Sequence, residues 1–236
     1  MNLKGAILQP TYLPWLGYFE MLAAADVYVA FDHVQFEPKS WQQRNYVKGP
    51  NGKVLLTIPV KSDGNLGVSI AQKRIDYSQA WVEKHLRTIE HGYRKAGHFD
   101  RYFPAVRGLY QRKPERLADF TIGLIAFFME ALGIQAKLLR SSDLAEDDGH
   151  LGKTERIIHL CQRAGIGVLH DGAVAAEFMD MGLVEVAGLK IVFQNYVHPV
   201  YPQLWGEFMP YLGVLDLLMN CGPDSLAVIQ SGRQIQ

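Results

Sequence analysis

The first 31 residues follow a strand, loop, helix, strand pattern, and this pattern constrains the fold more than any other feature of the sequence. Residues 3–8 form a short apolar run that ends at Gln9 and Pro10, which predicts a buried strand closed by proline. Apolar residues then recur at helical spacing from 15 to 25, and residues 27–31 are rich in β-branched and aromatic side chains. A strand, a helix and a strand in this order form a βαβ unit with parallel strands. We therefore expect a mostly parallel, Rossmann-like α/β sheet.

The middle of the chain predicts an insertion into this sheet. Two strand-like runs, 41–47 and 53–60, flank a Gly-Pro-Asn-Gly turn, which predicts a β-hairpin with a further short strand near 68–75. Three helices should follow, because apolar residues recur every three or four positions over 79–95, 99–111 and 114–132. Gly133 is expected to end the last of them. Residues 40–132 are therefore a candidate cap or insertion subdomain.

The last hundred residues return to alternating strands and helices. Strands are predicted at 134–139, 168–169 and 190–194, with a helix at 154–164 between the first two. A helix around 212–219 and a shorter one after Pro223 should close the chain. Because no linker-like composition separates the parts, we predict a single domain over residues 1–236.

Charge and hydropathy exclude several functional classes. The 236 residues contain 24 Lys and Arg against 24 Asp and Glu, so no overall field attracts nucleic acid or an anionic membrane. The N-terminus lacks the long apolar segment of a signal peptide, and the most apolar run, 122–132, is too short to span a bilayer. The cysteines and histidines show no metal-ligand spacing. We expect a cytoplasmic protein with no membrane insertion, no nucleic-acid partner and no metal.

Several motifs resemble those of the WbqC-like protein family. Residues 7–45, ILQPTYLPWLGYFEMLAAADVYVAFDHVQFEPKSWQQRN, resemble the family's opening signature, which ends in a W-x-x-R-N motif. Further matching segments are LTIPVK at 56–61, WVEKHLRTIEHGY at 81–93, SSDL at 141–144, ERIIHLC at 155–161 and YPQLWGEFMPYLGVLDLLMNCGP at 201–223. The resemblance extends over nearly the whole chain. It differs from the family pattern at His33, where an acidic residue often stands, so a pair of neighbouring catalytic carboxylates is in doubt.

The resemblance implies a place in the synthesis of bacterial polysaccharides or natural products, because such proteins are encoded mainly in gene clusters for these compounds. The expected activity is a tailoring transfer of an activated acyl or aminoacyl group to an amine by direct attack on the donor, with a small amine or a sugar as substrate. A coenzyme A thioester, or a phosphopantetheine thioester on a carrier protein, is the candidate donor. No other cofactor is predicted.

The main catalytic candidates follow the second predicted strand. In an open parallel sheet, ligands bind at the carboxyl ends of the strands, where Asp32, His33 and Gln35 should lie. Asp32 is suited to orient His33 or to pair with a substrate ammonium, and His33 to accept a proton from the attacking amine. The alternative is a solvated turn with a capping aspartate. His85, one helical turn after Trp81, is a third catalytic candidate, although a lone helical histidine is more often structural.

The other candidates are proposed for substrate binding. Strand alternation should place Arg44 on one face, and Trp41 and Asn45 on the other. Arg44 is suited to an anionic group, and Asn45 or Gln9 to a developing oxyanion. Asp216 would need a partner if buried, for which Arg44 or a substrate amine are candidates. The remaining binding candidates, which come from the family-like motifs, are Tyr12, Tyr18, Gln203 and Asn220.

Two other functional classes stay open. The loop from Gln9 to Tyr18 resembles the phosphate-binding HxGH loop of nucleotidyltransferases, with Trp15 and Tyr18 at the histidine positions. An adenylating enzyme would bind ATP at this loop, but without the imidazoles that clamp the triphosphate. The third class is a noncatalytic carrier-docking or assembly protein.

Overall fold

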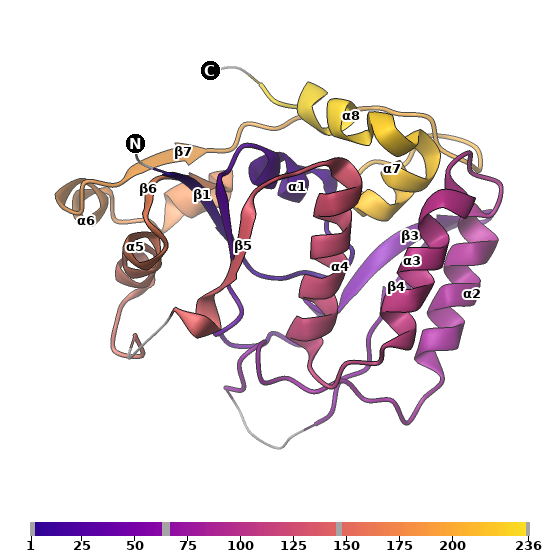
Figure 1. The fold of residues 1–236 in the computed structure, drawn as a ribbon, viewed down its shortest axis with the longest axis horizontal. Coiled ribbons are helices and arrows are strands. Elements are labelled where there is room, and N and C mark those ends of the chain that lie inside the picture. Colours follow the sequence, from indigo (N-terminus) through magenta and orange to yellow (C-terminus); the bar gives the residue numbers. More distant parts are fainter. Residues whose placement is uncertain (1–2, 63–66, 145–147, 235–236) are drawn as a thin grey trace.

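A central sheet of five parallel strands organises the computed structural model, which describes residues 3–62, 67–144 and 148–234. The strands pair in the order β5-β2-β1-β6-β7, and Figure 1 shows the sheet with α1, α4 and α5 around it. Their bounds are Leu3–Leu8 (β1), Val27–Ala30 (β2), Lys137–Arg140 (β5), Ile166–Asp171 (β6) and Lys190–Phe193 (β7). The predicted α/β class with a parallel Rossmann-like sheet is confirmed.

Strand alternation divides the core into two layers. Ala6, Tyr28 and Ala30 point into the larger layer, with helices α1 (Leu16–Ala23) and α4 (Leu117–Leu132). The intervening Ile7 and Val29 point to the other face, which α5 (Lys153–Ala164) and α6 (Met181–Val186) cover. Because β1 lies between β2 and β6, the strand order reverses at β1, and the loops after these strands meet at one edge of the sheet.

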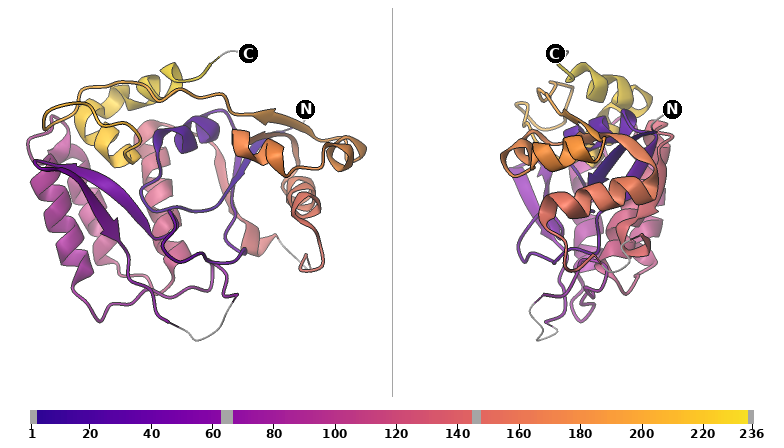
Figure 2. Two further views of the ribbon diagram at one scale, coloured as in Figure 1. Left: turned by 180° about the vertical axis from the view of Figure 1, so that it is seen from behind. Right: turned by 90° about the vertical axis from the view of Figure 1, so that its left-hand side faces the viewer.

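The predicted hairpin and three helices extend the larger layer away from the sheet. The hairpin consists of β3 (Arg44–Gly49) and β4 (Gly52–Thr57), and Figure 2 shows it beside the helices that follow. These helices are α2 (Trp81–Tyr93), α3 (Phe99–Gln111) and α4. A Cβ at Gly92 would lie 2.5 Å from the carbonyl oxygen of Lys48, so glycine allows α2 to approach β3 closely. The C-terminal helices are α7 (Val214–Cys221) and α8 (Ser225–Ser231).

The most apolar helix is part of this core. Phe120, Leu124 and Phe128 of α4 are buried in the cluster that also contains residues of α1, α2, α3 and α7. Within residues 3–62, 67–144 and 148–234, no helix is both long and apolar enough to cross a membrane.

Three details of the predicted secondary structure were wrong. Residues 68–75 do not form a strand, because isolated bridges alone join Ser69 to Gln35, Arg74 to Arg116 and Ile75 to Val60. The first hairpin strand begins at Arg44, since the preceding residues form a turn in which the Gln43 backbone N–H donates to the carbonyl oxygen of Ser40. Trp41 is in this turn and exposed, so strand alternation does not apply to it. Helix α6 was not predicted, because its short sequence leaves apolar residues such as Val186 on the surface.

Candidate functional site

Asp32 connects the carboxyl ends of β2 and β5. Its carboxylate is fully buried, and Oδ2 accepts a hydrogen bond from Nε of Arg140 at 2.8 Å and forms an ion pair with Nη2 at 2.7 Å. Oδ1 accepts from the backbone N–H of Ser142 at 2.9 Å. The pairing of Ala30 with Arg140 explains this arrangement, because it brings the two strand ends side by side. The contacts of Asp32 are therefore made within the protein, and a substrate ammonium would have to displace Arg140.

The imidazole of His33 lies between a hydroxyl and a carboxylate. Nδ1 is 2.7 Å from Oγ of Ser141, and Nε2 is 2.8 Å from Oδ2 of Asp148. When Nε2–H donates to Asp148, Nδ1 is an acceptor for the hydroxyl proton of Ser141, and Oδ1 of Asp32, 3.1 Å from the same Oγ, is the other acceptor for this proton. The Ser141 oxygen also accepts the backbone N–H of Asp32 at 2.9 Å. A hydroxyl, an imidazole and a carboxylate in this order are the groups used for nucleophilic acyl transfer.

Neighbouring side chains fix the orientation of this chain of groups. The ring of Phe31 packs edge-on against the His33 ring, with centroids 5.1 Å apart. Nε of Arg156, on α5, lies 3.2 Å from Oδ2 of Asp148. Ser141 is fully buried, whereas the His33 side chain is 16% exposed. Among the described residues, no three His, Cys, Asp or Glu side chains gather in a geometry that could hold a metal ion.

Two further candidates reach the same edge of the sheet. Gln9 directly follows β1 and is exposed, and its Oε1 accepts a hydrogen bond from Nε2 of Gln42 at 2.9 Å. Gln35 is also exposed and forms its bridge with Ser69. Both side chains are accessible to a ligand that binds beyond the carboxyl ends of the strands.

The loop after β1 is part of the core, so the fold itself uses several predicted binding residues. Tyr12 and Leu13 are fully buried, and Nδ2 of Asn45 donates to their carbonyl oxygens at 3.2 and 2.7 Å. At the start of α1, Trp15 forms an antiparallel bridge with Gly213. In nucleotidyltransferases the corresponding loop is open to phosphate. In this chain, the segment before α7 covers it.

Replacing Asn45 with alanine should lower the free energy of unfolding by about 2 kcal/mol, because two buried carbonyl oxygens would lose their donor. Urea denaturation measures this change. Asn51→Ala, at the exposed hairpin turn, is the control and should change stability by less than about 0.5 kcal/mol. An Asn45→Ala protein as stable as this control would contradict the role assigned to the amide.

His85 lies in a buried aromatic cluster away from the strand ends. Nδ1 of His85 is 3.0 Å from the hydroxyl of Tyr12, which also hydrogen-bonds the hydroxyl of Tyr110. The ring of Trp81 packs edge-on against the imidazole. Burial lowers the pKa of His85 to about 4, so the ring is neutral at pH 7. Tyr18 is likewise buried, with its hydroxyl bonded to that of Tyr28.

The candidates from the C-terminal motif surround a buried lysine. Nζ of Lys48 donates to Oε1 of Gln203 at 3.0 Å and to the carbonyl oxygen of Glu207 at 2.6 Å. Asp216 is buried nearby and accepts a hydrogen bond from the hydroxyl of Tyr201 at 2.9 Å. The partners of Asp216 are therefore Tyr201 and the charge of Lys48, and not Arg44 as the sequence led us to expect.

Burial has opposite effects on the two charged groups of this cluster. It raises the pKa of Asp216 and lowers the pKa of Lys48, in both cases because the charged form loses hydration. Nδ2 of Asn220 donates to the carbonyl oxygen of Asp216 at 2.7 Å. The cluster therefore joins the hairpin, residues 201–209 and α7.

Sequence reasoning did not assign roles to Arg140, Asp148 and Lys48. Ser141 and Ser142 follow a predicted strand, and the sequence suggested only a similarity to the serine motif of nucleotidyltransferases. Arg140 and Asp148 depend on β5 lying beside β2, which a single sequence does not indicate. Lys48 stands in an ordinary hairpin strand, and no local pattern marks it as buried.

Comparisons with known proteins give the relationship of the whole chain. The model of the WbqC-like protein family matches residues 9–228. The chain is 31% identical over 233 residues to the "Uncharacterized protein Rv1507c" of Mycobacterium tuberculosis (strain ATCC 25618 / H37Rv), covering 98% of this chain and 99% of that protein. No solved structure matches the chain significantly. The family model spans most of the chain and the relative nearly all of it, so the chain belongs to the WbqC-like protein family.

Proposed function

We propose that this protein transfers an activated acyl or aminoacyl group to an amine, as a tailoring step in the synthesis of a bacterial polysaccharide or natural product. The observation that supports this most strongly is the position of His33 between Oγ of Ser141 and the carboxylate of Asp148. Such an imidazole accepts the proton of a nucleophile while the carboxylate stabilises its positive form. The site lies at the carboxyl ends of adjacent parallel strands, where this fold class binds ligands.

In the proposed reaction, Ser141 carries the acyl group between donor and acceptor. Its Oγ attacks the carbonyl carbon of a thioester as the hydroxyl proton moves to Nδ1 of His33. The new C–O bond forms, the C–S bond breaks, and His33 returns the proton to the departing thiol. The amine then attacks the acyl-serine, the C–N bond forms, and the amine proton moves through His33 to the leaving Oγ.

The surroundings of His33 favour this two-step route over direct attack by the amine. Both ring nitrogens already have partners, so an incoming amine would have to displace Ser141 or Asp148. Because Ser141 is fully buried, the donor reaches Oγ only if the carboxyl ends of β2 and β5 open while the contact between Nδ1 and Oγ is kept. Gln9 is assigned to the developing oxyanion, and Gln35 and Arg44 to the substrate. Asp32 acts by positioning His33 and Ser141.

The test is to incubate the protein with acetyl- and aminoacyl-thioesters of coenzyme A and of a carrier protein, without an acceptor, and to locate any adduct by peptide mass spectrometry. We expect the mass of one acyl group on Ser141, no adduct in Ser141→Ala, and transfer to an added amine slowed about a hundredfold in His33→Ala. Ser142→Ala is the matched control, because its hydroxyl donates to Asp32 rather than to His33, and the adduct on Ser141 should persist in this variant.

Other outcomes separate the remaining mechanisms. Transfer that survives Ser141→Ala but fails in His33→Ala would replace the two-step route with direct attack. An adduct on Cys161 or Cys221 would assign the chemistry to a thiol. If no thioester is consumed and only ATP stabilises the protein against heat, acyl transfer from thioesters is wrong and an adenylating activity takes its place.

A further inference from the structure

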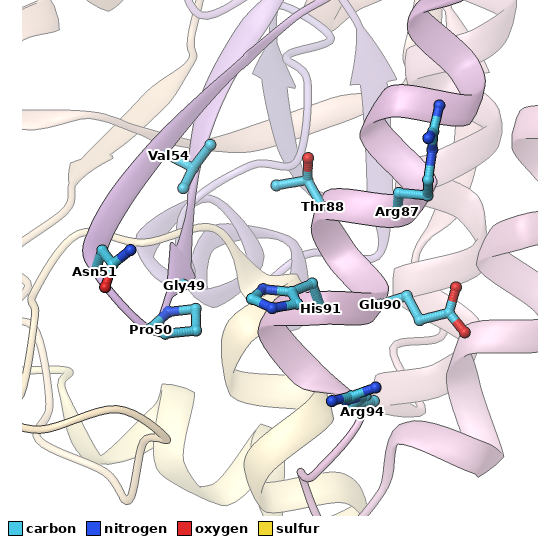
Figure 3. Close-up of a pocket in the computed structure, with 9 residues that line it drawn as sticks. All are labelled: Gly49, Pro50, Asn51, Val54, Arg87, Thr88, Glu90, His91 and Arg94. Atoms are coloured by element: carbon cyan, nitrogen blue, oxygen red, sulfur yellow. The ribbon is translucent and has the colours of Figure 1, made fainter.

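An open cleft separates the turn of the hairpin from α2. Its volume is about 610 Å³, and Figure 3 shows the side chains that line it. Thr88 and His91 point from α2 toward the hairpin, whereas Glu90 points to the opposite side. The side chains that line the cleft belong to Pro50, Asn51, Val54, Arg87, Thr88, Glu90, His91 and Arg94.

Basic side chains outnumber acidic ones around the cleft. The acidic residues Glu83 and Glu90 of α2 pair with Lys113 and Arg107, at 3.9 and 3.3 Å. Of the exposed basic residues of α2, Arg87, His91 and Arg94 line the cleft, together with Glu90. Although the chain has a formal net charge of zero, the cleft is locally basic.

The shape of the cleft fits an elongated partner better than a small molecule. Small-ligand sites enclose most of the ligand surface, whereas this cleft is open along the helix. From Arg87 to Arg94 the basic lining residues extend over about 10 Å, which is about two helical turns. Opposite them, Pro50 and Val54 supply an apolar wall.

We infer that this cleft docks a partner protein through an acidic amphipathic helix. Carboxylates spaced three and four residues apart on that helix would face Arg87, His91 and Arg94, and its apolar residues would contact Val54 and Pro50. In Figures 1 and 2, α2 and the hairpin lie at the far end of the molecule from the carboxyl end of β5. The surface is therefore separate from the candidate site at His33, and its occupancy does not depend on the proposed transfer reaction.

The test uses a labelled 18-residue helical peptide with glutamates at positions i, i+3, i+4 and i+7 and leucines on the adjacent face. Fluorescence anisotropy should give saturable binding that weakens as NaCl rises from 50 to 300 mM. The triple variant Arg87→Glu, His91→Glu, Arg94→Glu should weaken binding more than tenfold. A matched variant with three reversals elsewhere, Arg112→Glu, Lys137→Glu, Lys190→Glu, should change it less than about twofold.

Circular dichroism and urea denaturation establish that both triple variants fold. Equal loss of binding in the two variants would mean that only overall charge matters, which overturns the inference. So would binding of the same peptide with lysine in place of glutamate, or no saturable binding at 50 mM NaCl. If inorganic phosphate or pyrophosphate stabilises the wild type through Arg94 while the peptide does not bind, the cleft is a small-anion site and the docking inference is wrong.

Discussion

Replacing Arg140 with methionine should lower the free energy of unfolding by about 3–5 kcal/mol, because it leaves the buried charge of Asp32 without its counter-ion. Asp32 has no exposed surface and receives two nitrogens of the guanidinium, at 2.8 and 2.7 Å. The hydroxyl of Ser141 and the hydroxyl and backbone N–H of Ser142 remain as donors, but they do not neutralise the carboxylate. Methionine retains the apolar stem of arginine, so the loss reports on the charge and its hydrogen bonds. Equilibrium urea denaturation at pH 7 measures it.

Two further variants isolate the buried pair. In Asp32→Asn, Arg140→Met neither position of the pair carries a charge, so this protein should be more stable than Arg140→Met by about 1–3 kcal/mol. Asp119→Asn removes the other partner of Arg140, which is 43% exposed, and should cost less than about 1 kcal/mol. A double variant no more stable than the single one would show that the charge of Asp32 is not what makes Arg140 necessary.

The sheet could be predicted because its strands are short apolar runs closed by residues that stop strands. Residues 3–8 and 27–31 carry this signal in sequence, and both become central strands. The long amphipathic patterns of α2, α3 and α4 were equally clear. By contrast, residues 68–75 are tied to the fold by isolated bridges, which have no period for a sequence pattern to reveal.

The site was predictable only in part, because its contacts join distant segments of the chain. Placing His33 at the carboxyl end of a strand needed only the βαβ pattern. Its partners Ser141 and Asp148 are more than 100 residues away and depend on strand order. The family-like motif drew attention to Asn45, but its amide serves the loop after β1, which sequence alone could not distinguish from a ligand-binding role.

Acidification from pH 6.5 to 4 should destabilise the fold through His85 by about 3 kcal/mol. Burial lowers the folded-state pKa of this imidazole from 6.5 to about 4, a difference of about 2.5 units at about 1.4 kcal/mol each. The folded protein thus binds fewer protons here than the unfolded chain, so this stability is fully present above pH 6.5 and is lost as the pH falls toward 4. Urea denaturation at half-unit intervals between pH 4 and 7 measures how the free energy of unfolding changes with pH.

The variant His85→Asn separates this contribution from two carboxyl groups that act in the opposite direction. Burial raises the pKa of Asp171 to about 6 and also raises that of Asp216, so their contribution is present at low pH and is lost as the pH rises. The informative quantity is therefore the difference in the free energy of unfolding between wild type and His85→Asn. This difference should decrease by about 3 kcal/mol from pH 7 to pH 4. His91 is an exposed histidine on the same helix, so the free energy of unfolding of His91→Asn should change with pH as in the wild type. The free energy of unfolding could also change with pH equally in His85→Asn and in the wild type. The pKa of His85 would then be the same in the folded and unfolded chains, and burial would not lower it.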